Sequence, residues 1–505
     1  MSIDPRLPNY TRPEVEEAAP DVALVHDLLA GTRRMHARAT TYIRKWADEE
    51  PSVYAIRRAC ETVFEGLGRT LSAATGMLFA KAPGLEWNQS ETAMAEHWAN
   101  VDAAGAAGPV FVKRFAEAAL RDGIGILLVD HPTPPEGVTI TAANERSLGL
   151  RPTWAMYGRA QARSWRTAIV NNRRQLVQLV LHERAELESD VFGIAHVDRY
   201  RVLALVGGVA TWRVFQAKKA DADKIEDFEI VGSGLFRNTH GRVADFLPVA
   251  IGYTGRTDAP MTATIPLLGV AWANLAHWQQ STNLRFYREL CAFPQPTVVG
   301  ALAPDPQTGA AGTLRVGPMV AVHLTEVGAS FAWTELDGSS MAQLERGIDE
   351  KLGQMSKLGM AFLATDTRAA ETAEAKRLDA TAENSTLATA AQGIEDAVNL
   401  ACEFHAWYLG IEKAGAPVMS ISRDYESTAM DAATMTAYAN AVAGAGLPIR
   451  LLLEAWQDGG RIGPDEDLET LELEIEARRA ADAERERQAA DDRAREAAES
   501  TGAAA

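Results

Sequence analysis

The sequence has few cysteines, no long apolar run and no excess of positive charge. Its 505 residues include only three cysteines, Cys60, Cys291 and Cys402, and no two of them have the CxxC spacing. Their number and spacing argue against a disulfide framework or a zinc site and favour a reducing compartment. No apolar run reaches roughly 18 residues, so we expect no transmembrane helix. The acidic, proline-rich start predicts no signal peptide.

The charge and the composition describe an acidic globular protein. The formal net charge is −18, which argues against a protein that grips nucleic acid through a broad basic surface. Hydrophobic residues make up 47% of the chain and charged residues 23%, so most of the chain should fold. A chain of this length exceeds the size of a single hydrophobic core, and we expect two or more structural regions.

Helical periodicity dominates the first third of the chain. VALVHDLLAG predicts a helix that stops at Gly31, and further helices are expected from Tyr54 to about Ala80 and from about Val110 to Gly123. IGILLVDHP, which follows Gly123, predicts a buried strand. From about Arg151 to Tyr253 the pattern changes to alternating strands with turn signals between them.

The sequence pattern is helical again after residue 265. PLLGVAWANLAHWQQSTNLRFYRELCAFPQP predicts a rod of some 25 residues, roughly 37 Å long at about 1.5 Å per residue. Short strands are expected in 297–334, and a glycine-punctuated helix from about Met341 to Leu358. A long helix should span about 370–409, followed by a helical pair at about 429–443 and 449–456. The tail from Glu466 has a net charge of −7 and predicts a solvated helix or disorder.

The search for chemistry finds no catalytic or metal motif. Asp130-His131-Pro132 follows a strand but has no GxSxG partner, and a loop histidine is the better interpretation. His182-Glu183 and His26-Asp27 lack the HExxH spacing of zinc enzymes. The glycines of RDGIGILLVD precede a strand and therefore do not form a phosphate loop.

The paired arginines at 33–34, 57–58 and 173–174 indicate solvated faces or ion pairs between subunits rather than DNA contacts. Trp272, Trp278 and Trp407 lie on helices that need a partner surface, and packing in the core is a better interpretation of these side chains than a subunit interface.

The order of these elements, together with several local segments, resembles the portal proteins of tailed bacteriophages. The segments are DLLAGTRRM (27–35), YAIRRA (54–59), GMLFAKAP (76–83), GILLVDHP (125–132), RPTWAMY (151–157), LDGSSMAQLERGIDE (336–350), ETAEAKRLDATAENSTL (371–387) and GLPIRLLLEAWQDGG (446–460). The resemblance covers roughly 20–475. At 42–46 the chain reads YIRKW where the family has a Tyr-Leu-Pro-Lys segment, so this turn is expected to differ.

The resemblance implies an α+β fold with six regions. These are a mostly helical wing (1–150), a β-rich wing and clip region (151–260), a stem helix (261–293), wing strands (294–335), a tunnel loop and tunnel helix (336–369), and wing and crown helices (370–465). The acidic tail (466–505) lies outside the resemblance. The resemblance assigns Trp272, Trp278 and Arg285 to the stem, and Met341, Gly347 and Gly353 to the tunnel helix. The candidate channel-lining residues are Trp333, Glu335, Asp337, Ser339 and Ser340, with the loop 362–371 as a second candidate. An acidic lumen would let DNA slide, because each strong phosphate contact would act as a brake.

The resemblance also implies the partners. We expect a non-enzymatic ring, a dodecamer in this family, at one capsid vertex of the virion, assembled in the host cytoplasm. Double-stranded DNA passes through it, and the terminase large subunit, head-completion or tail proteins, major capsid protein and scaffold protein bind to it. No cofactor, metal or membrane is expected. Two alternatives stay open: another connector or minor head protein, and a soluble enzyme whose site has no recognised motif.

Overall fold

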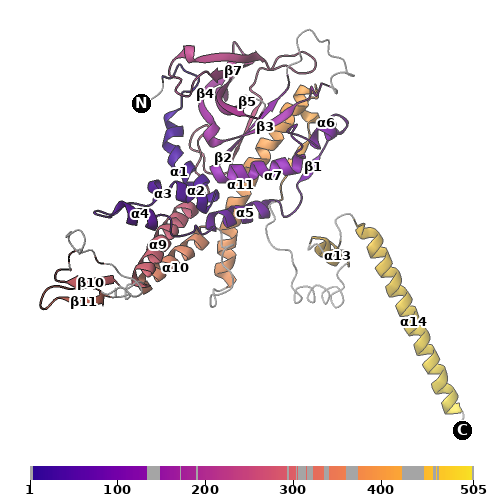
Figure 1. Cartoon of the computed structure of the whole chain (residues 1–505). Helices are drawn as coiled ribbons and strands as arrows, with labels where there is room; N and C mark the ends of the chain where they lie inside the picture. Colours follow the sequence, from indigo (N-terminus) through magenta and orange to yellow (C-terminus); the bar gives the residue numbers. More distant parts are fainter. Residues whose placement is uncertain are drawn as a thin grey trace. The chain divides into compact units, whose positions relative to one another are not determined.

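The computed structural model describes ten segments of the chain. They are 4–132, 148–170, 172–188, 192–292, 295–302, 324–334, 341–359, 373–422, 449–458 and 466–502, with positions 304, 314, 322 and 462. The chain divides into two compact units, Met1–Arg423 and Asp424–Ala505. Helices and antiparallel sheets occur together, which confirms the expected α+β class (Figure 1).

The first unit begins with a layer of helices. They are α1 (Pro13–Leu29), α2 (Thr32–Ala37), α3 (Ala39–Tyr42), α4 (Pro51–Arg57), α5 (Gly66–Leu78), α6 (Glu91–Trp98) and α7 (Gly108–Asp122). Gly31, with φ +80°, separates α1 from α2, as the sequence predicted. The single helix expected from Tyr54 to Ala80 is wrong, because 58–65 interrupt it. The side chain of Asn274 bonds the carbonyl of Phe64 and the amide of Leu67, so this backbone is held by tertiary contacts instead of by a helical turn.

A three-stranded antiparallel sheet forms the centre of the core. Its order is β3 (Thr153–Gly158), β2 (Ile124–Asp130) and β9 (Val249–Tyr253). The expected buried strand after Gly123 is confirmed as β2, in which every residue up to Val129 is buried. Gly123 has φ +78°, and a Cβ there would lie 2.4 Å from the carbonyl oxygen of Thr264, so glycine is required at this turn.

The β-rich segment folds as a five-stranded antiparallel meander. In order, it contains β4 (Ala162–Val170), β5 (Arg173–Glu188), β6 (Ile194–Val206), β7 (Val209–Ala217) and β8 (Phe228–Leu235), with the short 3-10 turns η1 (Arg159–Gln161) and η2 (Ile225–Asp227). The strands predicted in 160–216 are confirmed. Arg201 joins this sheet to the central one, because it pairs with Asp130 of β2 at 3.0 Å and with Glu183 of β5 at 2.7 Å.

The rest of the first unit contains three long helices. They are α9 (Leu268–Ala292), α10 (Met341–Leu358) and α11 (Ala373–Tyr408). The strand pair β10 (Gln295–Val299) and β11 (Ser330–Thr334) lies between α9 and α10 in the chain. After α11 come η3 (Lys413–Gly415) and β12 (Val418–Ser420), and β12 pairs with β1 (Gly84–Glu86). The other strands expected in 297–334 lie largely outside the described residues.

The second unit is described only as two helices, α13 (Ile449–Asp458) and α14 (Leu468–Gly502). The described side chains of α14 beyond Ile475 are nearly all exposed, so the acidic tail is a solvated helix. The helix expected at 429–443 lies outside the described residues. Among the helices that the structure describes, none combines the length and the apolar character needed to cross a bilayer.

Candidate functional site

The predicted stem and tunnel helices lie side by side. Helices α9 and α10 are in extensive contact along their lengths, and β10 and β11 lie at the end where α9 finishes and α10 begins (Figure 1). A Cβ at Gly269, near the start of α9, would contact Leu358 at the end of α10. The two helices therefore run antiparallel and form a helical hairpin.

The three predicted stem residues have different environments. Trp278 is fully buried: its Nε1 donates to the carbonyl of Glu61 at 3.2 Å and its ring stacks on His36. It is therefore a core residue, the interpretation that the sequence favoured for it. Trp272 is 52% exposed. Arg285 is half exposed and lies 3.9 Å from Glu61 and 3.3 Å from Glu289.

Helix α10 approaches α9 closely at Gly347. A Cβ at Gly347 would lie 3.3 Å from Oε1 of Gln280 on α9, so the absence of a side chain permits the close approach of the two helices. Met341 and Gly353 are partly buried. Met355 is fully buried and reaches Gly66 at the start of α5.

The structure describes only one of the five predicted channel-lining residues. Trp333 lies on β11, where it is half exposed and packs edge-to-face on Phe331 at 5.5 Å. Glu335, Asp337, Ser339 and Ser340 lie outside the described residues, as does the alternative loop 362–371.

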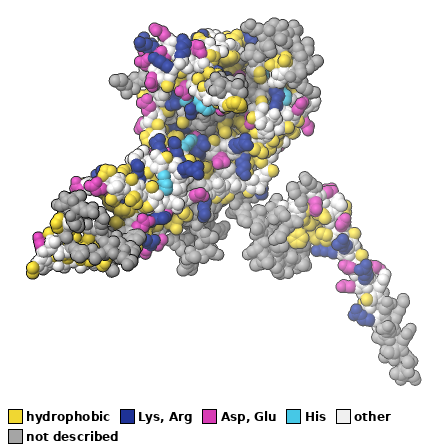
Figure 2. Space-filling model, in the orientation of Figure 1, with side chains coloured by type: hydrophobic (Ala, Val, Ile, Leu, Met, Phe, Trp, Pro, Cys, Tyr) yellow, Lys and Arg dark blue, Asp and Glu magenta, His cyan; other side chains and the backbone are white. Residues whose placement is uncertain are grey.

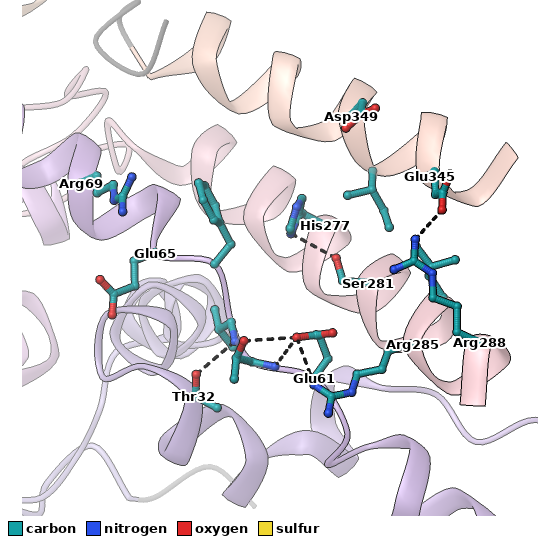
Figure 3. Close-up of a pocket in the computed structure, with 15 residues that line it drawn as sticks. Thr32, Glu61, Glu65, Arg69, His277, Ser281, Arg285, Arg288, Glu345 and Asp349 are labelled. Atoms are coloured by element: carbon teal, nitrogen blue, oxygen red, sulfur yellow. Dashed lines mark hydrogen bonds and ion pairs between the residues drawn. The ribbon is translucent and has the colours of Figure 1, made fainter. Parts of the chain in front are cut away.

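A groove of about 700 Å³ lies between the hairpin and the N-terminal helices (Figure 3). Segment 61–69 forms one wall, α9 the second and α10 the third. Its labelled lining residues are Thr32, Glu61, Glu65, Arg69, His277, Ser281, Arg285, Arg288, Glu345 and Asp349. Apart from Arg285, the sequence singled out none of them, because nothing in the spacing of 61–69, 277–288 and 345–349 shows that they meet.

Charges of both signs surround this groove. Arg288 of α9 is paired with Glu345 of α10, and Arg285 approaches Glu61 from the other side of the groove (Figure 3). Figure 2 shows Lys and Arg side chains gathered over the middle of the visible face, across the helices of this region. The groove is therefore suited to a partner that carries both charges rather than to a simple anion or cation.

His277 and Ser281 lie one helical turn apart inside the groove. His277 Nδ1 and Ser281 Oγ are 3.5 Å apart, at the limit of a hydrogen bond, and the imidazole packs against Phe64. Burial lowers the pKa of His277, while the nearby carboxylates of Glu61 and Asp349 oppose that shift. The pair has the residue types of a base and a nucleophile but not their close contact, so its geometry favours packing over catalysis.

The histidines whose sequence contexts were candidates for chemistry make structural contacts. His131 stacks on Tyr408, His182 bonds Asp198 at 2.9 Å, and His26 bonds the buried Asp122 at 2.7 Å. Burial opposes the ionisation of Asp122, but hydrogen bonds from Arg121 and His26 outweigh it and lower the pKa of this carboxyl. Within the described ranges, no group of three or more His, Cys, Asp or Glu side chains is arranged to hold a metal ion.

Two histidines and one tryptophan form a buried hydrogen-bonded series that the sequence did not predict. Trp154 Nε1 donates to His405 Nδ1 at 3.1 Å, and His405 Nε2 lies 3.0 Å from His97 Nδ1. Because the indole can only donate, His405 Nδ1 accepts and its Nε2 carries the proton. Burial lowers the pKa of His405 to about 3, and the nearby His97, Arg151 and His131 add to the shift.

This chain has limited similarity to known protein families and solved structures. Residues 266–409, from the start of α9 to the end of α11, match a family described as a domain of unknown function (DUF4055). No curated protein matches the chain. Among solved structures, "Virion of native gene transfer agent (GTA) particle" contains a similar chain at 12% identity, covering 83% of this chain and 98% of that chain, with a TM-score of 0.36. "Neck of native GTA particle computed with C12 symmetry" contains another, at 13% identity, 81% and 94% coverage and a TM-score of 0.34. These TM-scores are too low to establish a common function.

Proposed function

We propose that this chain is the portal subunit of a tailed phage or phage-like particle, a non-enzymatic protein that acts as a ring at one capsid vertex. The observation that carries the proposal is the α9–α10 hairpin with a strand pair between its helices. It lies where the sequence resemblance assigns the stem and the tunnel helix, and this agreement supports the proposal.

The order of elements along the chain adds support. A helical layer, a β-rich insert, a 25-residue helix, a strand pair, α10 and the long α11 follow one another as the resemblance to portal proteins implies. The hairpin also leaves large apolar side chains at the surface, among them Trp272 and Leu358, as a subunit of a larger assembly would. A ring built from repeated head-to-tail contacts needs such surfaces.

The proposal includes the channel and its partners. Double-stranded DNA would pass through the ring, and Trp333, Glu335, Asp337, Ser339 and Ser340 are the proposed lining residues. The acidic pair Glu335 and Asp337 would repel phosphates and prevent DNA from adhering. The terminase large subunit, head-completion or tail proteins, major capsid protein and scaffold protein are the proposed partners, and the virion vertex is the proposed location.

Negative-stain imaging and mass measurement of the purified protein test the assembly. A ring with a central opening and the mass of many copies is the expected result. Dispersed monomers under all assembly conditions would contradict the proposal, and a compact monomer that turns over a small molecule would favour the enzyme alternative.

A charge-reversal variant tests the channel. The double variant Glu335→Lys, Asp337→Lys should still form rings. It should slow DNA packaging and ejection, because the new lysines would bind the phosphates of the DNA. The matched control replaces two exposed acids of the β-rich region, Glu226→Lys and Glu229→Lys, with the same change in net charge. Equal packaging rates in both variants would remove Glu335 and Asp337 from the lumen.

A further inference from the structure

The groove beside the hairpin has the anatomy of a protein interface. Apolar side chains form part of its floor, with Val63 and Leu284 buried and Phe64 and Ile348 partly buried. Its rim is charged on both sides, as Figure 3 shows for Arg69, Glu65, Arg285 and Arg288. An apolar centre inside a polar rim is typical of surfaces that bind another protein.

A second surface, which is apolar and exposed, lies on and just after α4. Val53 and Ile56, one helical turn apart, are 37% and 58% exposed, and the small Ala55 and Ala59 beside them are exposed as well. Arg57 is the one charged residue in α4, and it is buried. We call Val53, Ala55, Ile56 and Ala59 the α4 ridge. An uncharged apolar ridge on so acidic a protein indicates a contact with another surface.

The α4 ridge and the groove lie on opposite sides of α9. The side chains of α9 that line the groove are His277, Ser281, Leu284, Arg285 and Arg288. Those that contact α3, α4 and the segment between them are Gln279, Asn283 and Phe286. At about 100° per residue, these two sets point roughly 180° apart around the helix. Each copy therefore presents the ridge on one flank and the groove on the other.

Charged residues also lie at the ends of the two surfaces. Asp48 and Glu50, both exposed, precede α4, and Arg58 follows it. At one end of the groove Arg285 and Arg288 lie beside Glu61 and Glu345, and at the other end lie Glu65 and Arg69 (Figure 3). One direction of docking brings the acidic end of the ridge to the arginines and Arg58 to Glu65.

We propose that the α4 ridge of one subunit docks into the groove of the next. This inference rests on the proposed ring, and it names the contact that closes it: Val53 and Ile56 of one copy against Phe64, Leu284 and Ile348 of its neighbour. Because ridge and groove are different surfaces, the contact is heterologous, and its repetition around an axis gives a ring rather than a dimer.

Disulfide trapping in the assembled protein tests this contact. The double variant Ile56→Cys with Ser281→Cys is made in a Cys60→Ser, Cys291→Ser background, in which the buried Cys402 is kept, and ring formation is confirmed first by mass. On mild oxidation we expect a ladder of covalent species well beyond the dimer, and no ladder from either single cysteine. Cross-linking within one chain is excluded by the opposite placement of the two sites, because a disulfide requires Cα atoms within about 7 Å.

The outcomes separate this inference from the proposed function. If intact rings give no ladder of covalent species on oxidation, or give covalent dimers only, the ridge-and-groove contact is overturned. The proposed ring is not contradicted by that result. Failure of the background protein to form any ring contradicts the proposed function itself.

A charge placed on the ridge gives a second measurement. Ile56→Asp should raise the protein concentration at which half of the chains are assembled by at least about tenfold, since it would bury an unpaired carboxylate. The control Ile169→Asp changes an equally apolar, more exposed side chain on β4 and should leave assembly unchanged. Equal assembly of the two variants would overturn the proposal.

Discussion

Arg57 Nη1 donates a hydrogen bond to Oδ1 of Asn283 at 3.1 Å, and this contact joins α4 to α9. The guanidinium is buried and also bonds both carboxylate oxygens of Glu49 at 2.8 Å and the carbonyl of Arg44. Its Cζ lies 3.8 Å from the centre of the Trp46 ring. These contacts together fix the helix that carries the α4 ridge.

Arg57→Ala should destabilise the first unit strongly. Removing one partner of a buried ion pair leaves Glu49 buried and unpaired, at a cost of about 3 kcal/mol or more. We expect a clearly lower midpoint in thermal unfolding, whereas Arg58→Ala, the adjacent and more accessible arginine, should change it little. Equal midpoints for the two variants would mean that the Arg57 network contributes nothing to stability.

Asn274→Ala should loosen the start of α5. The buried amide accepts from the Leu67 N–H and donates to the Phe64 carbonyl, both at 2.9 Å, and its loss leaves two buried backbone groups unsatisfied at about 1–3 kcal/mol each. Hydrogen exchange at Leu67 should accelerate markedly, while exchange in β6 should not change. Unchanged protection at Leu67 would show that the backbone of 64–67 holds its shape without Asn274.

Stability should fall on mild acidification because of His405. Its folded pKa of about 3 lies below the usual value near 6.5, so the unfolded chain binds a proton more readily than the folded chain does. The contribution of His405 to the free energy of unfolding is fully present above about pH 6.5 and declines as the pH falls toward 3. At pH 5 the loss is about 2 kcal/mol. His405→Gln, which keeps an acceptor for Trp154, should show a smaller loss of melting temperature between pH 7 and pH 5. An identical pH profile in the variant would exclude His405 as the source.

Two glycine-to-alanine changes in helices should have opposite signs. Gly76 of α5 is exposed, and a methyl group added there would have no described atom within 4 Å, so Gly76→Ala should stabilise by up to about 1 kcal/mol through helix propensity. A Cβ at Gly393 of α11 would lie 1.8 Å from the carbonyl oxygen of Tyr253, so Gly393→Ala must push α11 away from β9 and destabilise. Melting temperatures measured side by side check both signs, and stabilisation by Gly393→Ala would contradict the packing of α11 on β9.

The sequence determined the elements whose signal is local. Period-two alternation located β4 to β7, and the apolar run after Gly123 located β2. Both signals are local because burial of one or both faces of a strand determines which consecutive residues are apolar. Helices α9, α10 and α11 were predicted with nearly correct bounds for the same reason. The resemblance to portal proteins also rests on short contiguous segments, which a single sequence displays.

Tertiary structure alone decided where these elements meet. At the break between α4 and α5, Asn274, some 200 residues away, bonds the backbone of Phe64 and Leu67, and the groove brings together 61–69, α9 and α10. The His97–His405–Trp154 chain likewise joins three distant positions. Local periodicity says which face of a helix is apolar but not which surface covers it, because that is settled by long-range packing of side chains. For this reason Trp278 lies in the core while Trp272, on the same helix and equally apolar, remains exposed.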